Sequence, residues 1–256
     1  MKALGILPLL AGVAAFSVWY APSASAQNAQ QRVPEGGTRP ILVSIFIPPV
    51  TNAPFTATVN TVWTGRAPDG STHTVKNRRT IARDSAGRIF QERRRLTPDG
   101  DKQLTAITEL DFINPPSHEQ VVCDPDGQVC EIYNYWLMAS TVENSSADRV
   151  SAAADVKHED LGHDTIAGLD TVGTRETTTI APGTIGNDHA LDVVTEFWYS
   201  PQLGFRLLLN RTDPRTGSAN IRVTEIHLGE RDAKLFDPPS NYTIVDARKP
   251  AAPSSN

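Results

Sequence analysis

The feature that most constrains this chain is the alternation of apolar and polar residues in short stretches separated by turn residues. In residues 54–65 (PFTATVNTVWTG), Phe55, Ala57 and Val59 occupy one parity, while threonine and asparagine dominate the other. Similar stretches lie at 104–112, 190–199 and 203–209, between turns such as TPDG, DPDG and DPRTG. A period of two indicates half-buried strands, and frequent short turns favour an antiparallel meander. We therefore expect a mainly β fold with about 9–11 strands and one or two short helices.

The same alternation predicts which side chains face the core. Residues of one parity within a strand point to one side of the sheet. The residues expected on the buried side are Leu104, Ala106, Leu110 and Phe112 in the second stretch, and Leu203, Phe205, Leu207 and Leu209 in the last.

The first 26 residues have the pattern of a secretory signal peptide. Lys2 precedes an apolar run from Ala3 to Trp19, and the small residues Ala24-Ser25-Ala26 form a cleavage site. A membrane anchor is the alternative, but this run is short for a span and is interrupted by proline and glycine. We expect export to the periplasm or the extracellular space, with no transmembrane segment left after cleavage.

The mature chain is expected to form a single β domain over residues 41–246. Residues 27–40 are polar and contain glycine and proline, which predicts a flexible N-terminal segment. Residues 138–160 interrupt the alternation and are expected to form a linker or lid, and Arg231–Phe236 is expected to make a helical turn. Residues 247–256 cannot build a core and are expected to be a disordered tail.

The two cysteines, Cys123 and Cys130, stand on either side of a DPDG turn. Apolar strand formers flank both, so the segment predicts a hairpin with one cysteine on each arm. In an exported protein such a pair favours a structural disulfide. Free thiols or metal-binding thiols are the alternatives, although two thiols alone make a poor metal site.

Basic residues are concentrated between positions 71 and 100. This stretch carries eight lysines and arginines against three acidic residues, in a chain of net charge −5. The overall negative charge disfavours a nucleic-acid binder. The basic stretch favours docking of an anionic partner, and the simpler interpretation is a solvated strand face with paired charges. The candidate partner-binding residues here are Arg79, Arg93 and Arg95.

Aromatic residues lie in the strand-like stretches, where core packing is the usual role. If the sheet is curved enough to leave a cavity, some of them would line a ligand site. The candidates for that role are Trp63, Tyr133, Tyr135 and Trp198.

Three long stretches, 54–94, 163–204 and 213–245, resemble a family of exported β-rich bacterial proteins that has no assigned activity. More distantly, the TIAGLDT segment at 165–171 and the LFDPP segment at 235–239 resemble the lipoprotein-carrier superfamily of lipoprotein-sorting proteins and envelope-stress sensors. That resemblance implies a strongly curved antiparallel sheet, a half-barrel, whose concave apolar side is closed by helices. This chain departs from the plan because it has few helical segments.

No sequence motif assigns a catalytic residue, a metal ligand or a cofactor. The G-x-S-x-G pattern of a nucleophilic hydrolase is absent from the sequence, and most aspartates lie in turns, where they serve the backbone. We expect an exported, non-enzymatic protein that binds a hydrophobic ligand or an envelope partner protein. The alternatives are a regulatory or scaffold protein that docks an acidic partner through the basic strands, and a hydrolase of envelope polymers.

Overall fold

Strands make up most of the described chain. The structure is a computed structural model and describes residues 44–67, 69–135 and 155–248. These residues all belong to one unit, Pro40–Asn256. The predicted signal peptide and the 27–40 segment lie outside the described residues. The elements are β1 (Phe55–Arg66), β2 (Thr72–Arg83), β3 (Ile89–Arg94), β4 (Ile107–Asn114), η1 (Pro115–Ser117), β5 (Glu119–Asp124), β6 (Val129–Asn134), β7 (Asp155–Ile166), β8 (Leu169–Ile180), β9 (Leu191–Ser200), β10 (Phe205–Asp213), β11 (Gly217–Leu228), η3 (Ala233–Phe236) and β12 (Thr243–Asp246).

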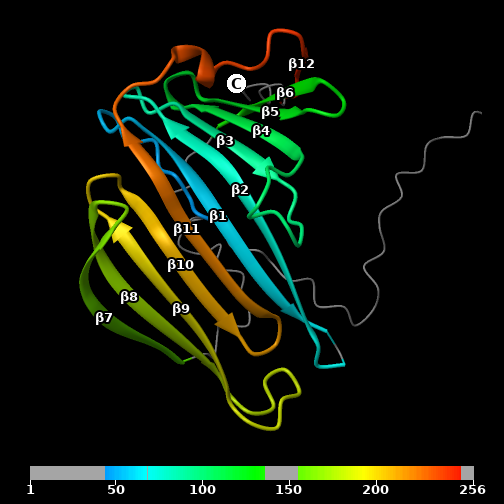
Figure 1. Ribbon diagram of the computed structural model, residues 1–256, viewed down its shortest axis with the longest axis vertical. Helices are drawn as coiled ribbons and strands as arrows, with labels where there is room; N and C mark the ends of the chain where they lie inside the picture. The colour runs from blue at the N-terminus through cyan, green and yellow to red at the C-terminus, as the bar shows by residue number, and fades with distance from the viewer. Residues whose placement is uncertain (1–43, 68, 136–154, 249–256) are drawn as a thin grey trace, which may run out of the picture. The chain divides into compact units, whose positions relative to one another are not determined.

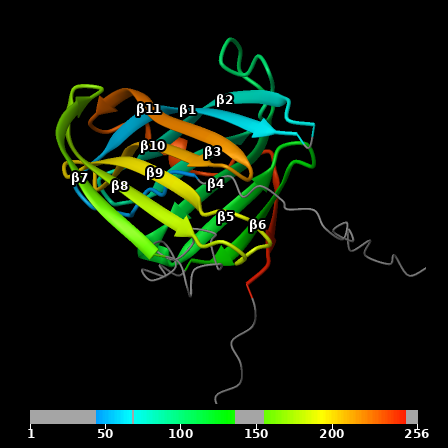
Figure 2. The same cartoon turned by 90° about the horizontal axis from the view of Figure 1, so that it is seen from below.

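The described strands form one sheet of 12 strands in the order β12-β6-β5-β4-β3-β2-β1-β11-β10-β9-β8-β7. Neighbouring strands are antiparallel, except that β12 runs parallel to β6. Strands β1 and β11 lie side by side near the middle of the sheet (Figure 1). The sheet is strongly curved (Figure 2). The predicted mainly β fold with a curved antiparallel sheet is confirmed, with 12 strands in place of about 9–11.

The concave side of the sheet holds the larger apolar core. Phe55, Ala57 and Val59 of β1 are buried there, as their shared parity predicts. The segment before β1 lies along this side (Figure 2), and its Ile45 and Ile47 join the same cluster. The predicted set Leu203, Phe205, Leu207 and Leu209 is also buried in this core.

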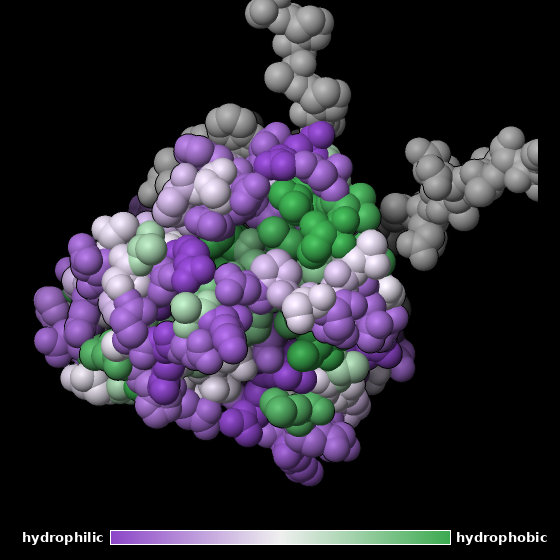
Figure 3. All heavy atoms as spheres, turned by 90° about the horizontal axis from the view of Figure 1, so that it is seen from above, coloured by the Kyte–Doolittle hydropathy of each residue, from purple (hydrophilic) through white to green (hydrophobic). Residues whose placement is uncertain are grey.

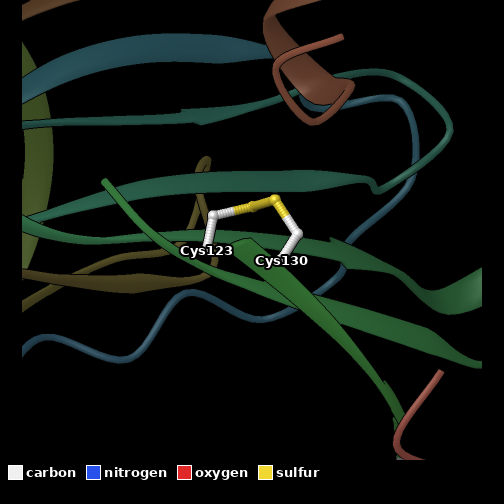
Figure 4. Close-up of a disulfide and its surroundings, with 2 residues drawn as sticks. All are labelled: Cys123 and Cys130. Carbon is white, nitrogen blue, oxygen red and sulfur yellow. A yellow bond between two sulfur atoms is a disulfide. The ribbon is translucent and has the colours of Figure 1, made fainter. Parts of the chain in front are cut away.

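The opposite face carries a second, smaller core over β3 to β6. Cys123 and Cys130 are directly opposite each other on β5 and β6 and form a disulfide. Figure 4 shows this bond on the side of the sheet where the C-terminal 3-10 turn lies. Phe236 of that turn is buried in the same cluster as the disulfide, together with Phe90 and Phe112. The predicted disulfide and the predicted helical turn are therefore confirmed.

The prediction for residues 104–112 is partly wrong. Strand β4 begins only at Ile107, and Leu104 is 69% exposed. Leu110 and Phe112 do share a face, but it is the face of the disulfide cluster, while Asp111 is buried on the concave side. Both faces are covered at this end of the sheet, so the apolar parity does not identify the concave face.

Two predicted segment boundaries also change. Residues 155–160, expected at the end of the linker or lid, are the first residues of β7. The rest of that segment, from 138 to 154, lies outside the described residues. Ala247 and Arg248, expected in the disordered tail, are bound to the sheet: the Ala247 amide donates to Ile132, and Arg248 pairs with Glu119 at 2.9 Å. The remaining tail residues are not described.

The end of the sheet that carries β12 has an apolar area on its surface. Figure 3 looks onto this end and shows green side chains surrounded by polar ones. Exposed apolar residues of β12 are Ile244 and Val245, at 50% and 43%. Within the described residues, no helix has the length and apolar character that a membrane span requires.

Candidate binding site on the concave face

Buried polar side chains line the concave face over β2 to β4. Arg79 is opposite Val59 of the apolar core, so it points to the concave side. In the same way, Ile81 is opposite Gln91, and Gln91 is opposite Asp111. Because opposite residues in neighbouring strands share a face, these polar residues form a row beside the apolar core. Arg79, Gln91 and Asp111 are only 5%, 6% and 3% exposed.

Arg79 has few partners for a buried charge. One terminal nitrogen donates to Ser44 Oγ at 3.1 Å, and the other reaches Gln91 Oε1 at 3.5 Å. Among the described residues, no carboxylate oxygen lies within 4.0 Å of this guanidinium. Burial lowers the pKa of Arg79 to about 10, and the nearby positive charge of Arg93 lowers it further, against the opposing charge of Glu92. A buried charge without an opposite charge in direct contact is unusual in a folded protein.

Arg83, on the same face of β2, is a buried arginine whose guanidinium donors are paired with acceptors. It is 1% exposed and donates to the carbonyl oxygens of Ala53, Pro48 and Leu203, at distances between 2.8 and 3.1 Å. Its guanidinium also lies 5.2 Å from the ring centre of Phe55. Arg83 therefore joins three segments of backbone and has a structural role that Arg79 lacks.

Acidic groups lie further along the row. Asp111 accepts a hydrogen bond from Gln120 Nε2 at 2.9 Å, and burial raises its pKa despite that bond and the nearby charge of Arg93. Burial also raises the pKa of Glu109, whose carboxylate lies 3.7 Å from Arg93. The buried hydroxyl of Tyr135 has no hydrogen-bond partner in the described chain, and burial raises the pKa of that hydroxyl.

A pocket of about 330 Å³ opens over β4, β5 and β6. Its lining includes Val122, Cys123, Val129 and Thr108, and its carboxylates come from Glu109, Asp124 and Glu131. Ligand pockets are mostly apolar with a few polar groups. This pocket has more charge than that, so it fits a polar or cationic group better than a hydrocarbon chain. Among the described residues, no group of three or more His, Cys, Asp or Glu side chains is arranged to hold a metal ion.

No protein-family model matches this chain, and a comparison with curated proteins finds no match. Several solved structures are similar. An uncharacterised conserved protein from Thermus thermophilus is 13% identical, over 75% of this chain and 90% of that chain, with a TM-score of 0.40. A chain of the MucA/MucB complex of Pseudomonas aeruginosa is 12% identical, over 77% of this chain and 59% of that chain, with a TM-score of 0.41. A LolA superfamily protein from Nitrosomonas europaea is 10% identical, over 71% of this chain and 89% of that chain, with a TM-score of 0.24.

The structure separates the three predicted arginines. Arg79 and Arg93 lie on the concave face, where Arg79 is buried and Arg93 is half-exposed. A bulge between Arg93 and Arg94 changes the register of β3 against β4. Arg95 follows the end of β3, where its side chain is exposed and its backbone amide donates to Ala106. Only Arg79 and Arg93 therefore lie on the same face of the sheet.

The other basic residues of positions 71–100 do not form one docking face. Successive residues of β2 and β3 point to opposite sides of the sheet, so the charges are divided between its two faces. Most of them also have acidic partners, which leaves little net charge on either face. The pairs are Lys76–Asp101, Arg78–Glu225, Arg88–Asp84 and Arg94–Glu92.

The predicted aromatic residues are also dispersed. Trp63 makes an edge contact with His73 near the β1–β2 turn, about 13 Å along β1 from the position opposite Arg79. Trp198 lies against Gly173 and packs against the larger apolar core. Tyr133 is on the concave face beside the pocket, where its hydroxyl donates to Glu131. Tyr135 is the one aromatic candidate close enough to Asp111 to be affected by its charge.

Sequence reasoning missed the uncharged and acidic members of the row, Gln91, Asp111 and Glu109. A usable signal existed for Arg79. It is two residues from Ile81 and four from Arg83, so all three share one face of β2, and an isoleucine at 81 marks that face as buried. No comparable signal marked Asp111, because its strand is apolar on the other parity.

Proposed function

We propose that this chain is an exported binding protein that acts without catalysis. Its ligand is an extended segment of an envelope partner protein, bound on the concave face over β3 to β6. One observation carries the proposal: the concave face already holds an extended segment of this chain. In residues 44–47, Ile45 and Ile47 are buried, at 4% and 2%, while Phe46 between them is 42% exposed. Extended peptides are recognised in this manner, through pockets for alternate side chains.

The contacts of this segment show what the face offers to a peptide backbone. Arg83 donates to the carbonyl oxygen of Pro48 at 2.8 Å, and Arg79 donates to Ser44 Oγ. Sheet arginines thus hold the segment while the apolar core takes its isoleucines. A partner segment beside it would find Val122 and Val129 for apolar contact.

A hydrophobic ligand such as an acyl chain is less well supported. The apolar core on the concave side is closed: Val59, Ile81 and Leu207 are 0% exposed. The pocket that is open carries three carboxylates, which would lose water beside a hydrocarbon chain. These features favour a polypeptide over a lipid.

Photo-cross-linking in the envelope tests this proposal. A benzophenone amino acid replaces Glu131, which is exposed at the pocket, and as a control Arg222, which is exposed on the convex face of β11. We expect an adduct of polypeptide mass from position 131 and none from position 222, measured by intact-protein mass spectrometry and peptide sequencing. An adduct of lipid mass would contradict the polypeptide ligand. An unchanged mass at position 131 would contradict a binding role for this face.

A further inference from the structure

The strongest unexplained feature of the concave face is the positive charge of Arg79. Three other arginines of β2 and β3 have strong partners. Arg78 pairs with Glu225 at 3.2 Å, Arg83 binds three carbonyl oxygens, and Arg94 binds both oxygens of Glu92, at 2.9 and 3.1 Å. Arg79, with its single short hydrogen bond to a hydroxyl, is the exception among these four.

Arg79 lies where β2 and β3 separate. The paired positions of the two strands end at Ile81 and Gln91, and the next available amide, that of Thr80, donates to the side chain of Glu92 at 2.8 Å in place of a strand backbone. Continuing the register past this point brings Arg93 level with Arg79 on the concave face. The backbone pairing resumes at Lys76 and Thr97, so the two guanidinium groups lie beside an interrupted stretch of the sheet, and the Arg93 group is half-exposed.

A neighbouring acceptor is also unused. Asn77 is two residues before Arg79 on the same face, and it is 7% exposed. Its Nδ2 donates to the Arg94 carbonyl at 2.6 Å, while its Oδ1 is buried without a hydrogen-bond partner in the described chain. Buried polar atoms nearly always have a partner, so an unused acceptor on Asn77, two positions from a buried arginine that has no carboxylate partner, points to a bound polar group.

We propose that Arg79 and Arg93 bind a carboxylate of the partner segment, with Asn77 Oδ1 accepting an N–H from the same segment. This inference rests on the proposed function and names the chemistry that its ligand carries. A guanidinium matches the two oxygens of a carboxylate in a planar, paired geometry. The carboxylate replaces the contact between Arg79 and Ser44 Oγ.

The acidic side chains on the same face favour a single negative charge over a double one. Glu109 lies 3.7 Å from Arg93, and Asp111 is opposite Gln91, the neighbour of Arg79. A phosphate dianion would meet more repulsion from these groups than a carboxylate would. Acidic peptide side chains and fatty acids both carry a carboxylate, and the experiment separates these two sources.

Binding to the full mature chain tests the site. The probes are an acetylated, amidated pentapeptide Ile-Ser-Glu-Ser-Ile, the same peptide with glutamine in place of glutamate, decanoate, and decanol. Calorimetry gives each Kd for the wild-type chain, for Arg79→Gln and Arg93→Gln, and for the control Arg78→Gln. Arg78 is the matched control because it is the adjacent residue of β2 on the convex face.

We expect the wild-type chain to bind the glutamate peptide about tenfold or more tightly than the glutamine peptide. Arg79→Gln and Arg93→Gln should remove that preference, and Arg78→Gln should keep it. Circular dichroism establishes that each variant is folded. In the wild-type chain, the nitrogen and proton shifts of the Arg79 side chain should move when the glutamate peptide binds.

The outcomes separate the site from the proposed function. Equal binding of both peptides, or binding of neither peptide and no decanoate, would overturn the carboxylate site, and the cross-linking result would still decide the proposed function. Decanoate binding that depends on Arg79, without peptide binding, would support the site and contradict the polypeptide ligand. A preference that survives Arg79→Gln would also overturn the inference.

Discussion

Replacing Arg83 and Arg79 separately by methionine should have very different effects on stability. The two arginines lie on the same face of β2, are 1% and 5% exposed, and have pKa values that burial lowers to about 10. A lowered pKa of a base means that the charged form is less stable in the folded chain. This destabilisation is fully present below pH 10 and is relieved as the pH rises from the lowered pKa to the ordinary arginine pKa of the unfolded chain. A shift of this size corresponds to about 3 kcal/mol for each residue.

The difference between the two variants comes from the hydrogen bonds. Methionine at position 83 leaves three carbonyl oxygens without their donor, and each bond to a charged group contributes about 2 kcal/mol. Losing the three hydrogen bonds costs about 6 kcal/mol, and removing the buried charge recovers about 3 kcal/mol, so the net destabilisation is about 3 kcal/mol. Methionine at position 79 removes only the bond to Ser44 and a long contact to Gln91, so the same relief leaves the stability unchanged or slightly higher. Methionine suits both sites because its flexible side chain fills irregular space.

Urea denaturation at pH 7, followed by tryptophan fluorescence, measures both effects. We expect Arg83→Met to lower the free energy of unfolding by about 3 kcal/mol, which corresponds to a Tm about 6–12 °C lower in a domain of this size. Arg79→Met should keep or raise the urea concentration at the unfolding midpoint. Equal losses in the two variants would refute the reasoning, because they would show that Arg79 is held by contacts as strong as those of Arg83.

Three further predictions concern other parts of the sheet. Reduction of the Cys123–Cys130 disulfide should lower the free energy of unfolding by about 2 kcal/mol, measured in urea with and without reductant. Burial raises the pKa of Asp111, so the folded state keeps this proton to higher pH than the unfolded state, and stability falls as the pH rises from the ordinary carboxyl pKa of 3.8 through the raised one. Asp111→Asn should flatten that fall in urea midpoints measured from pH 4 to 7. Gly217→Ala should destabilise by about 2 kcal/mol or more, because its φ is +114° and a Cβ there would lie 1.9 Å from a backbone oxygen. Gly162→Ala, at φ +77° with open space around it, should cost about half as much.

The features that sequence reasoning predicted correctly are local ones. The period of two in β1 fixes which side chains share a face, and the buried Phe55, Ala57 and Val59 follow from it. The hairpin of Cys123 and Cys130 follows from a turn flanked by strand formers. Each of these depends on the residues of one or two neighbouring strands.

The pairing of distant strands could not be predicted in the same way. Val59 of β1 is opposite Val223 of β11, and Ile244 of β12 is opposite Cys130 of β6 in parallel orientation. Backbone hydrogen bonds hold such pairs, and they are the same for every residue type except proline. The sequence therefore contains the strands but gives no signal that joins the first long strand to the eleventh.

The candidate site was only partly predictable for a related reason. Ile81 marks the concave face of β2, so the burial of Arg79 has a signal in the sequence. In β4 the apolar residues Leu110 and Phe112 mark the other face, which the C-terminal turn covers. Asp111 then looks like an ordinary exposed residue, although it is 3% exposed. Whether a second face is covered depends on segments far away in the chain.

A curved sheet with little helix has a consequence for where binding and stability lie. In the described ranges η1 and η3 are the only helical segments, and residues 44–50, which are extended chain, supply part of the cover of the concave face. Extended chain brings unpaired backbone carbonyls into the core, and a buried arginine such as Arg83 satisfies several of them at once. The same requirement arises wherever a partner segment adds to the cover. On our proposal Arg79 binds the partner segment, whereas Arg83 binds backbone carbonyls, including that of Pro48 in residues 44–50. The two methionine variants should therefore differ in stability. Binding of the carboxylate should depend on Arg79 and not on Arg83.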